Sequence, residues 1–358
     1  MNSSLSPTLA LASAVDNARS MGKEAWSLST PTFPTPSGLP KISNDWLKLS
    51  PPAGLPSLRK KSRDAFFGNW NAPDHSCIVT AGAKAAIFSI LSAAFPMRSA
   101  IIIPQPAWPS YIDLCSAVGA VPIFFDTSYD DFTIDYSALD DLVESSGAKA
   151  ILMANPCNPT GRILSASELT TLVEICDRRG VFLILDQSFS NIIFDKAVWK
   201  TAVIPAFEKL VLIDSFSKNY LMQGARVGSA LLPNDLVAKT VTNHQNLVSA
   251  APTPGQYLAL WALQQDERMP DLLEQRQMAS EFILEMGWSA YPQQGTFYFF
   301  PKVPNLQNFQ SFAEAQGVFL LSGKVFGANY CNHFRLCFGK PVSELSLIFS
   351  RLLEGTRC

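Results

Sequence analysis

Short apolar runs alternate with longer amphipathic stretches along the middle of the chain, from about residue 77 to residue 232. This alternation is typical of βα units whose strands join a mostly parallel sheet. Several of the runs are apolar throughout, as expected of strands that are buried on both faces. The pattern therefore predicts seven strands, at residues 77–80, 100–103, 121–125, 150–153, 181–186, 210–215 and 226–232.

Apolar residues recur at helical spacing between these strands, most clearly at 83–94, 167–179 and 236–245. Ser165 and Ser167 stand at the start of the second segment, where a serine hydroxyl can cap the first turn of a helix. Beyond residue 270 the pattern changes to one long helix at 271–286, followed by short strands near 297–301 and 333–338. We therefore expect an α/β core and a smaller α+β domain, with a boundary near Pro270.

A stretch rich in proline, serine and threonine precedes this core, at residues 29–56. Because proline and small polar residues interrupt helices and strands, the stretch is predicted to be an irregular loop. We expect this loop to line a functional site.

The charge balance argues against a nucleic-acid partner. Lysine and arginine total 28 against 30 aspartate and glutamate residues, for a net charge of −2, and the basic residues are scattered rather than gathered in a stripe. With 358 residues, 47% of them hydrophobic, the chain is long enough to bury a deep site. No stretch resembles a membrane span or a signal core, so a cytoplasmic protein without a membrane partner is expected.

The cysteines and histidines argue against several kinds of site. The seven cysteines form no CxxC pair and have no histidine at ligand spacing, which favours reduced thiols over a disulfide framework or a zinc site. The three histidines, at positions 75, 244 and 333, make a catalytic triad or a multi-histidine metal centre hard to build. No metal is expected, and the chemistry has to come from other residues.

Three polar motifs follow predicted strands, at the edge where open α/β sheets bind ligands. The first is Asn155-Pro-Cys-Asn-Pro-Thr-Gly161, whose two Asn-Pro steps fix turns and present Asn158 as a rigid amide. The second is Asp186, a carboxylate that ends an apolar run and is costly to bury unless it meets a cation. The third is Ser215-Phe-Ser-Lys218, which is followed by Arg226 in a Gly-Ala-Arg-Val-Gly segment.

In these motifs, their order and their spacing, the sequence resembles the fold-type I enzymes that use pyridoxal 5'-phosphate (PLP), and specifically the class I/II aminotransferase family. The resemblance extends over essentially the whole chain. It implies a PLP-dependent transferase-like fold, with a large PLP-binding domain at residues 38–270 and a smaller domain formed by residues 1–37 and 271–358. It also implies a homodimer with the site at the subunit interface.

The resemblance implies a role for each motif residue. Lys218 matches the lysine that holds PLP as a Schiff base, Asp186 the carboxylate that pairs with the pyridinium nitrogen, and Asn158 the amide that donates to the phenolic oxygen. Arg335 matches the arginine that binds the α-carboxylate of an amino-acid substrate, with Thr30 and Asn158 also on the substrate side. The positions that match the phosphate site and the ring that stacks on the pyridine are Gly82, Ala83, Lys84, Trp108, Ser215, Ser217 and Arg226.

These residue types also suit the chemistry on physical grounds. A lysine desolvated in a cleft beside Arg226 has its charged form disfavoured, so its amine becomes nucleophilic near neutral pH. The Asp186 carboxylate keeps a pyridine nitrogen protonated, and the N-terminus of a helix supplies unpaired N–H groups for a phosphate. Taken singly, each residue also has an ordinary explanation, with Lys218 on the surface, Trp108 in the core or Arg335 in an ion pair.

Phe189 departs from the family pattern. The family usually has a tyrosine there, whose hydroxyl bonds the phenolic oxygen of PLP, so Phe189 is expected beside the cofactor without that donor. Leu49 stands where many relatives have a tyrosine that reaches the neighbouring subunit's phosphate, and Thr30 stands where glycine is common. The expected function is that of an aminotransferase acting on an amino acid through an external aldimine and a quinonoid intermediate.

Two alternatives stay open. The same scaffold carries PLP-dependent lyases, cyclases and oxidases of modified amino acids such as arginine derivatives, and some of those also lack the tyrosine that Phe189 replaces. A PLP-sensing regulatory domain is the other alternative, although such proteins usually carry a DNA-binding module and the enzyme fold leaves no room for one. Tyr111 and Tyr298 are further candidates for lining the substrate pocket.

Overall fold

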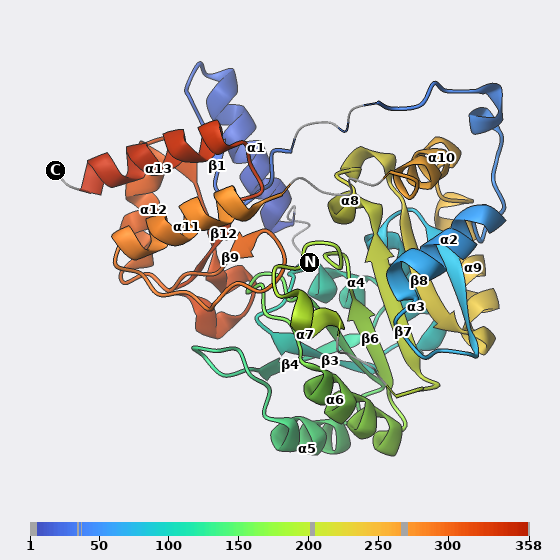
Figure 1. Cartoon of the computed structure of the whole chain (residues 1–358). Helices are drawn as coiled ribbons and strands as arrows, with labels where there is room; N and C mark the ends of the chain where they lie inside the picture. The colour runs from blue at the N-terminus through green and yellow to red at the C-terminus, as the bar shows by residue number, and fades with distance from the viewer. Residues whose placement is uncertain (1–5, 34–35, 37, 201–204, 266–270, 357–358) are drawn as a thin grey trace.

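A seven-stranded sheet forms the centre of the chain in the computed structural model, which describes all residues except 1–5, 34–35, 37, 201–204, 266–270 and 357–358 (Figure 1). The strand order is β2-β8-β7-β6-β5-β3-β4, and β8 is antiparallel to both neighbours while the other pairs are parallel. The predicted α/β fold with a mostly parallel, seven-stranded sheet is confirmed. The strands are β2 (His75–Thr80), β3 (Ala100–Gln105), β4 (Val121–Asp126), β5 (Ala150–Ala154), β6 (Phe182–Asp186), β7 (Leu210–Ser215) and β8 (Gly228–Pro233).

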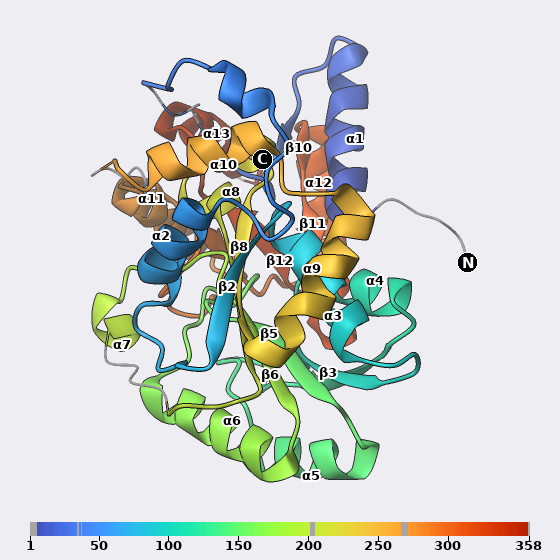
Figure 2. The same ribbon diagram turned by 90° about the vertical axis from the view of Figure 1, so that its right-hand side faces the viewer.

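Different helices cover the two faces of the sheet, because side chains along a strand alternate between its faces. On β2, Cys77 and Val79 pack on one face and Ile78 packs on the other. Figure 2 shows α3 and α9 side by side on the Ile78 face, where α4 also packs. The helices of that face are α3 (Ala83–Ala94), α4 (Ser110–Ala117) and α9 (Asn234–Val248), and those of the opposite face are α2 (Pro56–Phe67), α5 (Tyr136–Ser146), α6 (Ala166–Arg179) and α10 (Thr253–Ala262).

Capping signals set the ends of the predicted helices. The hydroxyl of Ser165 accepts from the Glu168 N–H at the start of α6, while the Glu168 side chain accepts from the Ser165 N–H. This reciprocal arrangement satisfies two N–H groups that lack partners within the helix. At the other end, Gly180 adopts the left-handed conformation that terminates the helix. The helices predicted at 83–94, 167–179 and 236–245 are thus found as α3, α6 and α9.

A second apolar cluster joins the two ends of the chain. It packs Leu28, from the N-terminal segment, against Phe334 and Leu352, and Figure 1 shows the blue helix α1 beside the red and orange C-terminal elements. Strand β1 pairs in parallel with β10, and β11, β12 and β9 form an antiparallel sheet. The elements are α1 (Pro7–Ser20), β1 (Trp26–Ser27), α11 (Leu273–Glu285), β9 (Tyr298–Phe299), α12 (Leu306–Ala315), β10 (Val318–Phe319), β11 (Leu321–Ser322), β12 (Phe334–Cys337) and α13 (Val342–Thr356).

The segments predicted after residue 270 correspond to α11, β9 and β12, whereas the short strands β1, β10 and β11 were not predicted. The predicted boundary near Pro270 lies outside the described residues, so the domain limits stay a prediction. None of the described helices has the length and apolar character needed to cross a membrane.

The proline-rich stretch before the sheet is irregular, as predicted. Its described residues between Ser29 and Leu55 contain a short 3-10 helix, η1 (Asn44–Leu47), and neither an α-helix nor a strand. Trp46 of this segment stacks on Tyr257 of α10, with ring centroids 5.4 Å apart. The contact fixes the middle of the segment against the helix layer.

Candidate active site

A cavity of about 360 Å³ lies at the carboxyl edge of the sheet, where the loops after β5, β6 and β7 meet β9 and β12. Gly82 lies in the turn directly before the part of α3 that lines this cavity. Thr30 is not among the lining residues, although the carbonyl of its neighbour Ser29 accepts from Arg335 Nη2 at 2.8 Å. The predicted site residues that line the cavity are Ala83, Lys84, Trp108, Asn158, Asp186, Phe189, Ser215, Ser217, Lys218, Arg226 and Arg335.

Lys218 lies in the short helix α8 (Phe216–Asn219), directly after β7. The hydroxyl of Ser215 caps this helix by accepting from the Ser217 N–H at 3.1 Å, which fixes the start of the turn that presents the lysine. Burial, assisted by the positive charges of Arg335 and Arg226, lowers the pKa of Lys218 from 10.5 to about 8. At pH 7 about a tenth of the amine is therefore uncharged, which is the form that a nucleophile requires.

Asp186 ends β6 and is 6% exposed. Its Oδ1 accepts from the Ser188 N–H at 3.0 Å and the Ser188 hydroxyl at 2.5 Å, and its Oδ2 accepts from the Tyr111 hydroxyl at 2.9 Å. Burial raises the pKa of Asp186, and these donors oppose the rise. Among the described residues the carboxylate has no ion-pair partner, so it is a buried acid that faces the cavity and lacks a cation.

Asn158 and Arg335 are joined across the cavity. Arg335 Nη1 donates to Asn158 Oδ1 at 3.1 Å. Because a guanidinium can only donate, the amide oxygen of Asn158 must face Arg335, which leaves the amide NH₂ as a donor on the cavity side. The donor predicted for position 158 is therefore available, and its orientation is set by Arg335.

Arg335 is buried, with 3% of its surface exposed, and no carboxylate among the described residues pairs with it. Two aromatic rings hold its guanidinium instead. Its guanidinium carbon lies 4.2 Å from the ring centroid of Tyr298 and 5.3 Å from that of Phe326. Two aromatic faces stabilise the cation and fix its plane. A planar cation in that setting offers paired donors to a carboxylate that enters the cavity.

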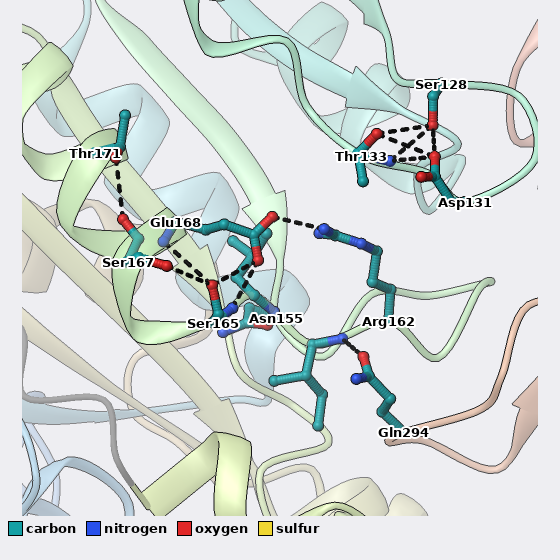
Figure 3. A network of polar contacts seen from close by, with 12 residues as sticks. Ser128, Asp131, Thr133, Asn155, Arg162, Ser165, Ser167, Glu168, Thr171 and Gln294 are labelled. Carbon is teal, nitrogen blue, oxygen red and sulfur yellow. Dashed lines mark hydrogen bonds and ion pairs between the residues drawn. The ribbon is translucent and has the colours of Figure 1, made fainter.

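Polar contacts fix the loop that follows β5 and carries Asn158, and Figure 3 shows those of Asn155, Arg162 and Glu168. The side-chain oxygen of Asn155 accepts from the Leu164 N–H at 3.0 Å, which ties the two ends of the loop together. Arg162 forms an ion pair of 2.6 Å with Glu168, the residue that also caps α6. The loop is thereby fastened to a helix whose start is itself capped, so Asn158 keeps its place.

Arg226 marks the other end of the cavity, beside the start of α3. Its Nη2 donates to the Ala81 carbonyl at 3.3 Å, and its Nη1 lies 3.5 Å from the Ser217 hydroxyl. A side chain at Gly82, whose φ is 85°, would come within 2.5 Å of Arg226 Nη2. Glycine is thus required where the arginine crosses the helix start, and the free N–H groups of α3 lie next to its charge.

Several contacts around these residues were not predicted from the sequence. The hydrogen bond from Tyr111 to Asp186 joins residues 75 positions apart. Ser6, Thr8 and Leu9, at the start of α1, also line the cavity, and no motif marked them. The backbone contact of Ser188 was accessible from the sequence, because an aspartate carboxylate commonly accepts from the backbone N–H two residues further on.

Residues 38–352 match the family "Aminotransferase class I and II". The chain belongs to this family. The aminotransferase is 26% identical to the asparagine--oxo-acid transaminase of Streptococcus mutans, over 97% of this chain and 95% of that protein. It is equally similar, at 26% over the same shares, to the aspartate aminotransferase of Geobacillus stearothermophilus. Its fold matches the solved aspartate aminotransferase from Thermus thermophilus with maleate at a TM-score of 0.87, with 22% identity over 98% of this chain and 97% of that one.

The aminotransferase is a PLP-dependent transferase, as its family is, and its residues fit that cofactor. A buried carboxylate without a cation, Asp186, suits a protonated ring nitrogen. A half-buried amine of lowered pKa, Lys218, suits a covalent bond to an aldehyde. The helix start beside Arg226 suits a phosphate dianion.

Proposed function

We propose that this aminotransferase moves the amino group of an α-amino acid to a keto acid, with Lys218 as the covalent anchor of PLP and as the acid/base at the substrate Cα. The proposal depends on one observation. Asp186 ends β6, Lys218 follows the adjacent strand β7, and both line one cavity; Asp186 is buried, Lys218 is half-buried, and neither has an ion-pair partner among the described residues. A charged side chain that is shielded from water and lacks a partner is unfavourable. A ligand that supplies the opposite charge stabilises it.

PLP, when bound, supplies the electron sink that makes loss of the Cα proton possible. Lys218 takes up that proton as a free amine and returns it as an ammonium, and a pKa of about 8 permits both states near neutral pH. Asp186 holds a proton on the ring nitrogen, and Tyr111 and Ser188 keep its oxygens aimed at the cavity. The Asn158 NH₂ donates to the phenolic oxygen.

Arg335 binds the substrate α-carboxylate in this proposal. The two rings beside its guanidinium hold the plane of the donors, so the carboxylate of any α-amino acid is received in one orientation. That orientation presents the Cα–H bond to Lys218.

We assign the phosphate to a site formed by Gly82, Ala83, Ser215, Ser217 and Arg226, here called the phosphate cup. Arg226 is exposed in the single chain. Exposed apolar side chains also gather on the segment before α2, where Ile42, Leu47 and Leu49 are 73%, 78% and 79% exposed. Apolar groups in such number are typical of a protein interface. We therefore infer a homodimer whose second subunit covers this segment and the open side of the cup. A cytoplasmic location stays part of the proposal.

The test is to incubate the purified holoenzyme with a panel of amino acids without any keto acid and to follow the visible absorption. Conversion of the cofactor to pyridoxamine phosphate, with release of one keto acid per site, is the expected result. Retention of PLP together with release of ammonia, loss of water or uptake of oxygen would contradict transamination.

Phe189 favours a second candidate, a PLP-dependent lyase, cyclase or oxidase of a modified amino acid such as an arginine derivative. Its ring lines the cavity and packs edge-on against Phe297, with centroids 5.3 Å apart, so it offers no hydroxyl to the cofactor. With one donor fewer, Asn158 alone would stabilise the charge on the phenolic oxygen. The proton affinity of the groups next to the substrate would change as a result. The same incubation distinguishes the two candidates.

A further inference from the structure

The turn at the start of α3 is held from behind by a buried histidine. Ala81 and Gly82 connect β2 to α3, whose first residues line the cavity. His244, on α9, is 1% exposed, and its Nε2 lies 2.9 Å from the Ala81 nitrogen. It is not among the residues that line the cavity. Any effect of His244 on a ligand must therefore act through the turn.

The direction of this hydrogen bond fixes the state of the imidazole. A backbone N–H can only donate, so Nε2 of His244 accepts and the ring is neutral, with its proton on Nδ1. Nδ1 has no hydrogen-bond partner among the described residues. Burial lowers the pKa of His244, which favours the same neutral form. The side chain is thus a dedicated acceptor for Ala81.

Both backbone polar groups of Ala81 are bound by side chains from distant parts of the chain. Its N–H donates to His244 at 2.9 Å, and its carbonyl accepts from Arg226 Nη2 at 3.3 Å. The next N–H, of Gly82, turns back to the Thr80 carbonyl at 2.8 Å. The two peptide planes of the turn are therefore fixed relative to Arg226, and the N–H groups that begin α3 are fixed with them.

We propose that His244 is a positioning residue for the phosphate cup, and this inference rests on the cup proposed above. By accepting the Ala81 N–H, it holds the start of α3 so that the free N–H groups and Arg226 converge on one phosphate. Convergence matters because a helix N-terminus binds an anion through N–H groups that point at it. Without the acceptor, the Ala81 N–H is left buried and unsatisfied, and the turn shifts to find another partner.

The test compares the binding of PLP with that of pyridoxal, which lacks the phosphate, to the apoenzyme. His244→Leu removes the acceptor, whereas His244→Gln keeps one near the place of Nε2. We expect His244→Leu to weaken PLP binding roughly tenfold, the value of one hydrogen bond. Pyridoxal binding should change by less than about twofold, since it makes no contact through a phosphate. His244→Gln should recover most of the affinity, and inorganic phosphate should compete with PLP less well in His244→Leu.

His75→Leu is the matched control. His75 is also a buried histidine, its Nε2 also makes one backbone contact, at 3.0 Å to the Leu210 oxygen, and it lies at the opposite end of β2. It should lower stability and leave the ratio of the two affinities unchanged. If His244→Leu does not fold, His244→Asn serves instead, because its shorter amide cannot reach Ala81.

Equal weakening of both ligands, or of neither, in the His244 variant overturns the proposal. Arg226→Gln separates this failure from failure of the cup itself. If Arg226→Gln weakens PLP selectively and His244→Leu does not, the cup stands and His244 has no positioning role. If Arg226→Gln spares PLP, the phosphate lies elsewhere and both assignments are wrong.

Discussion

Two buried aspartates lie at the carboxyl ends of the neighbouring strands β6 and β7, Asp186 as the last residue of β6 and Asp214 as the last but one of β7, and only Asp186 faces the cavity. Asp186 lines it, whereas Asp214 is fully buried and does not. Asp214 accepts from the Ser190 hydroxyl at 2.6 Å, the Asn219 amide at 2.5 Å and the Ser215 N–H at 2.6 Å. Burial raises the pKa of both carboxyl groups.

The two carboxylates differ in the parts of the chain to which their hydrogen-bond donors belong. The donors to Asp214 join Asn219, the residue after Lys218, to Ser190 in the loop after β6. This contact holds the end of one strand to the next and leaves the carboxylate no room for a ligand. Asp186 keeps a face toward the cavity, so a cation can reach it. One acid is thus available for chemistry, and the other stabilises the frame that holds the lysine.

Lys218→Ala should have the largest effect. Under the proposed roles it removes the covalent anchor and the acid/base together, so turnover should fall by at least about 10⁴-fold and the visible absorption of the bound cofactor should be lost. Absorption spectra, and mass spectrometry after borohydride reduction, measure this. A variant that still fixes the cofactor after reduction would refute the assignment.

Asp186→Ala tests whether the aspartate that faces the cavity takes part in the chemistry. We expect kcat to fall roughly 10²- to 10⁴-fold and the cofactor to bind loosely, because the ring nitrogen loses its counter-ion. Steady-state rates at saturating PLP and equilibrium dialysis measure the two effects. Asp214→Asn is the matched control, since it changes a carboxylate that is also buried but does not reach the cavity. Near-normal rates in Asp186→Ala would count against the role of Asp186.

The pH dependence of the reactivity of Lys218 in the apoenzyme tests whether the cavity lowers the pKa of its amine. Since burial lowers the pKa to about 8, the free-amine fraction should be nearly constant above that pH and fall about tenfold per unit below it. Trace labelling with acetic anhydride, read on the peptide that contains Lys218, gives the profile. The chain unfolded in urea is the control and should show a midpoint near 10.5. A folded-state midpoint at that value would mean that the site does not desolvate the lysine.

Asp214→Asn tests whether Asp214 stabilises the fold around Lys218 without reaching the cavity. We expect a loss of about 1–3 kcal/mol in the free energy of unfolding, with turnover reduced by no more than a few-fold, because hydrogen bonds are weakened away from the cavity. The raised pKa means that the folded chain keeps a proton that the unfolded chain, with an ordinary value of 3.8, releases. The stability contributed by Asp214 is therefore full at low pH and declines as the pH rises through the folded-state pKa.

Urea titrations of wild type and Asp214→Asn at pH 5 and pH 8 measure the difference, which should be larger at the lower pH. A loss of activity as large as that of Asp186→Ala, with stability unchanged, would reverse the roles given to the two acids.

Phe189→Tyr should have the smallest effect. The added hydroxyl restores a donor near the phenolic oxygen and should shift the pH midpoint of the visible absorption to lower pH, with rates changed by only a few-fold. Tyr298→Phe removes a hydroxyl from a neighbouring ring, 5.8 Å from Phe189 by centroid, and serves as the control. Unchanged spectra and products in Phe189→Tyr would make the missing hydroxyl incidental.

Much of the fold was predictable from the sequence because its signals are local. Alternating side chains on strands buried on both faces produce uninterrupted apolar runs, and each of the seven predicted strands is present. The short strands β1 and β10 were missed because each has two residues and depends on pairing across 292 positions, between Trp26 and Val318. Two residues alone show no alternation, and β9, which is equally short, was predicted only because it lies within the apolar run at residues 297–300.

The residue types of the site were also predictable, since Lys218, Asp186, Asn158 and Arg226 stand in motifs with fixed spacing. Their hydrogen-bond partners from distant helices were not. Tyr111, which bonds Asp186, and His244, which bonds Ala81, come from helices on the same face of the sheet, and nothing near them in the sequence marks either contact.

The sequence by itself determined which residues lie near the ends of the strands, because each apolar run is followed directly by polar residues. It presented Leu185-Asp186 and Ile213-Asp214 as near equivalents. Only the tertiary structure decided that one aspartate meets the cavity and the other meets Ser190 and Asn219. The reason is geometric: strand position fixes the face on which a side chain lies, but the environment of that face is made by elements distant in the chain.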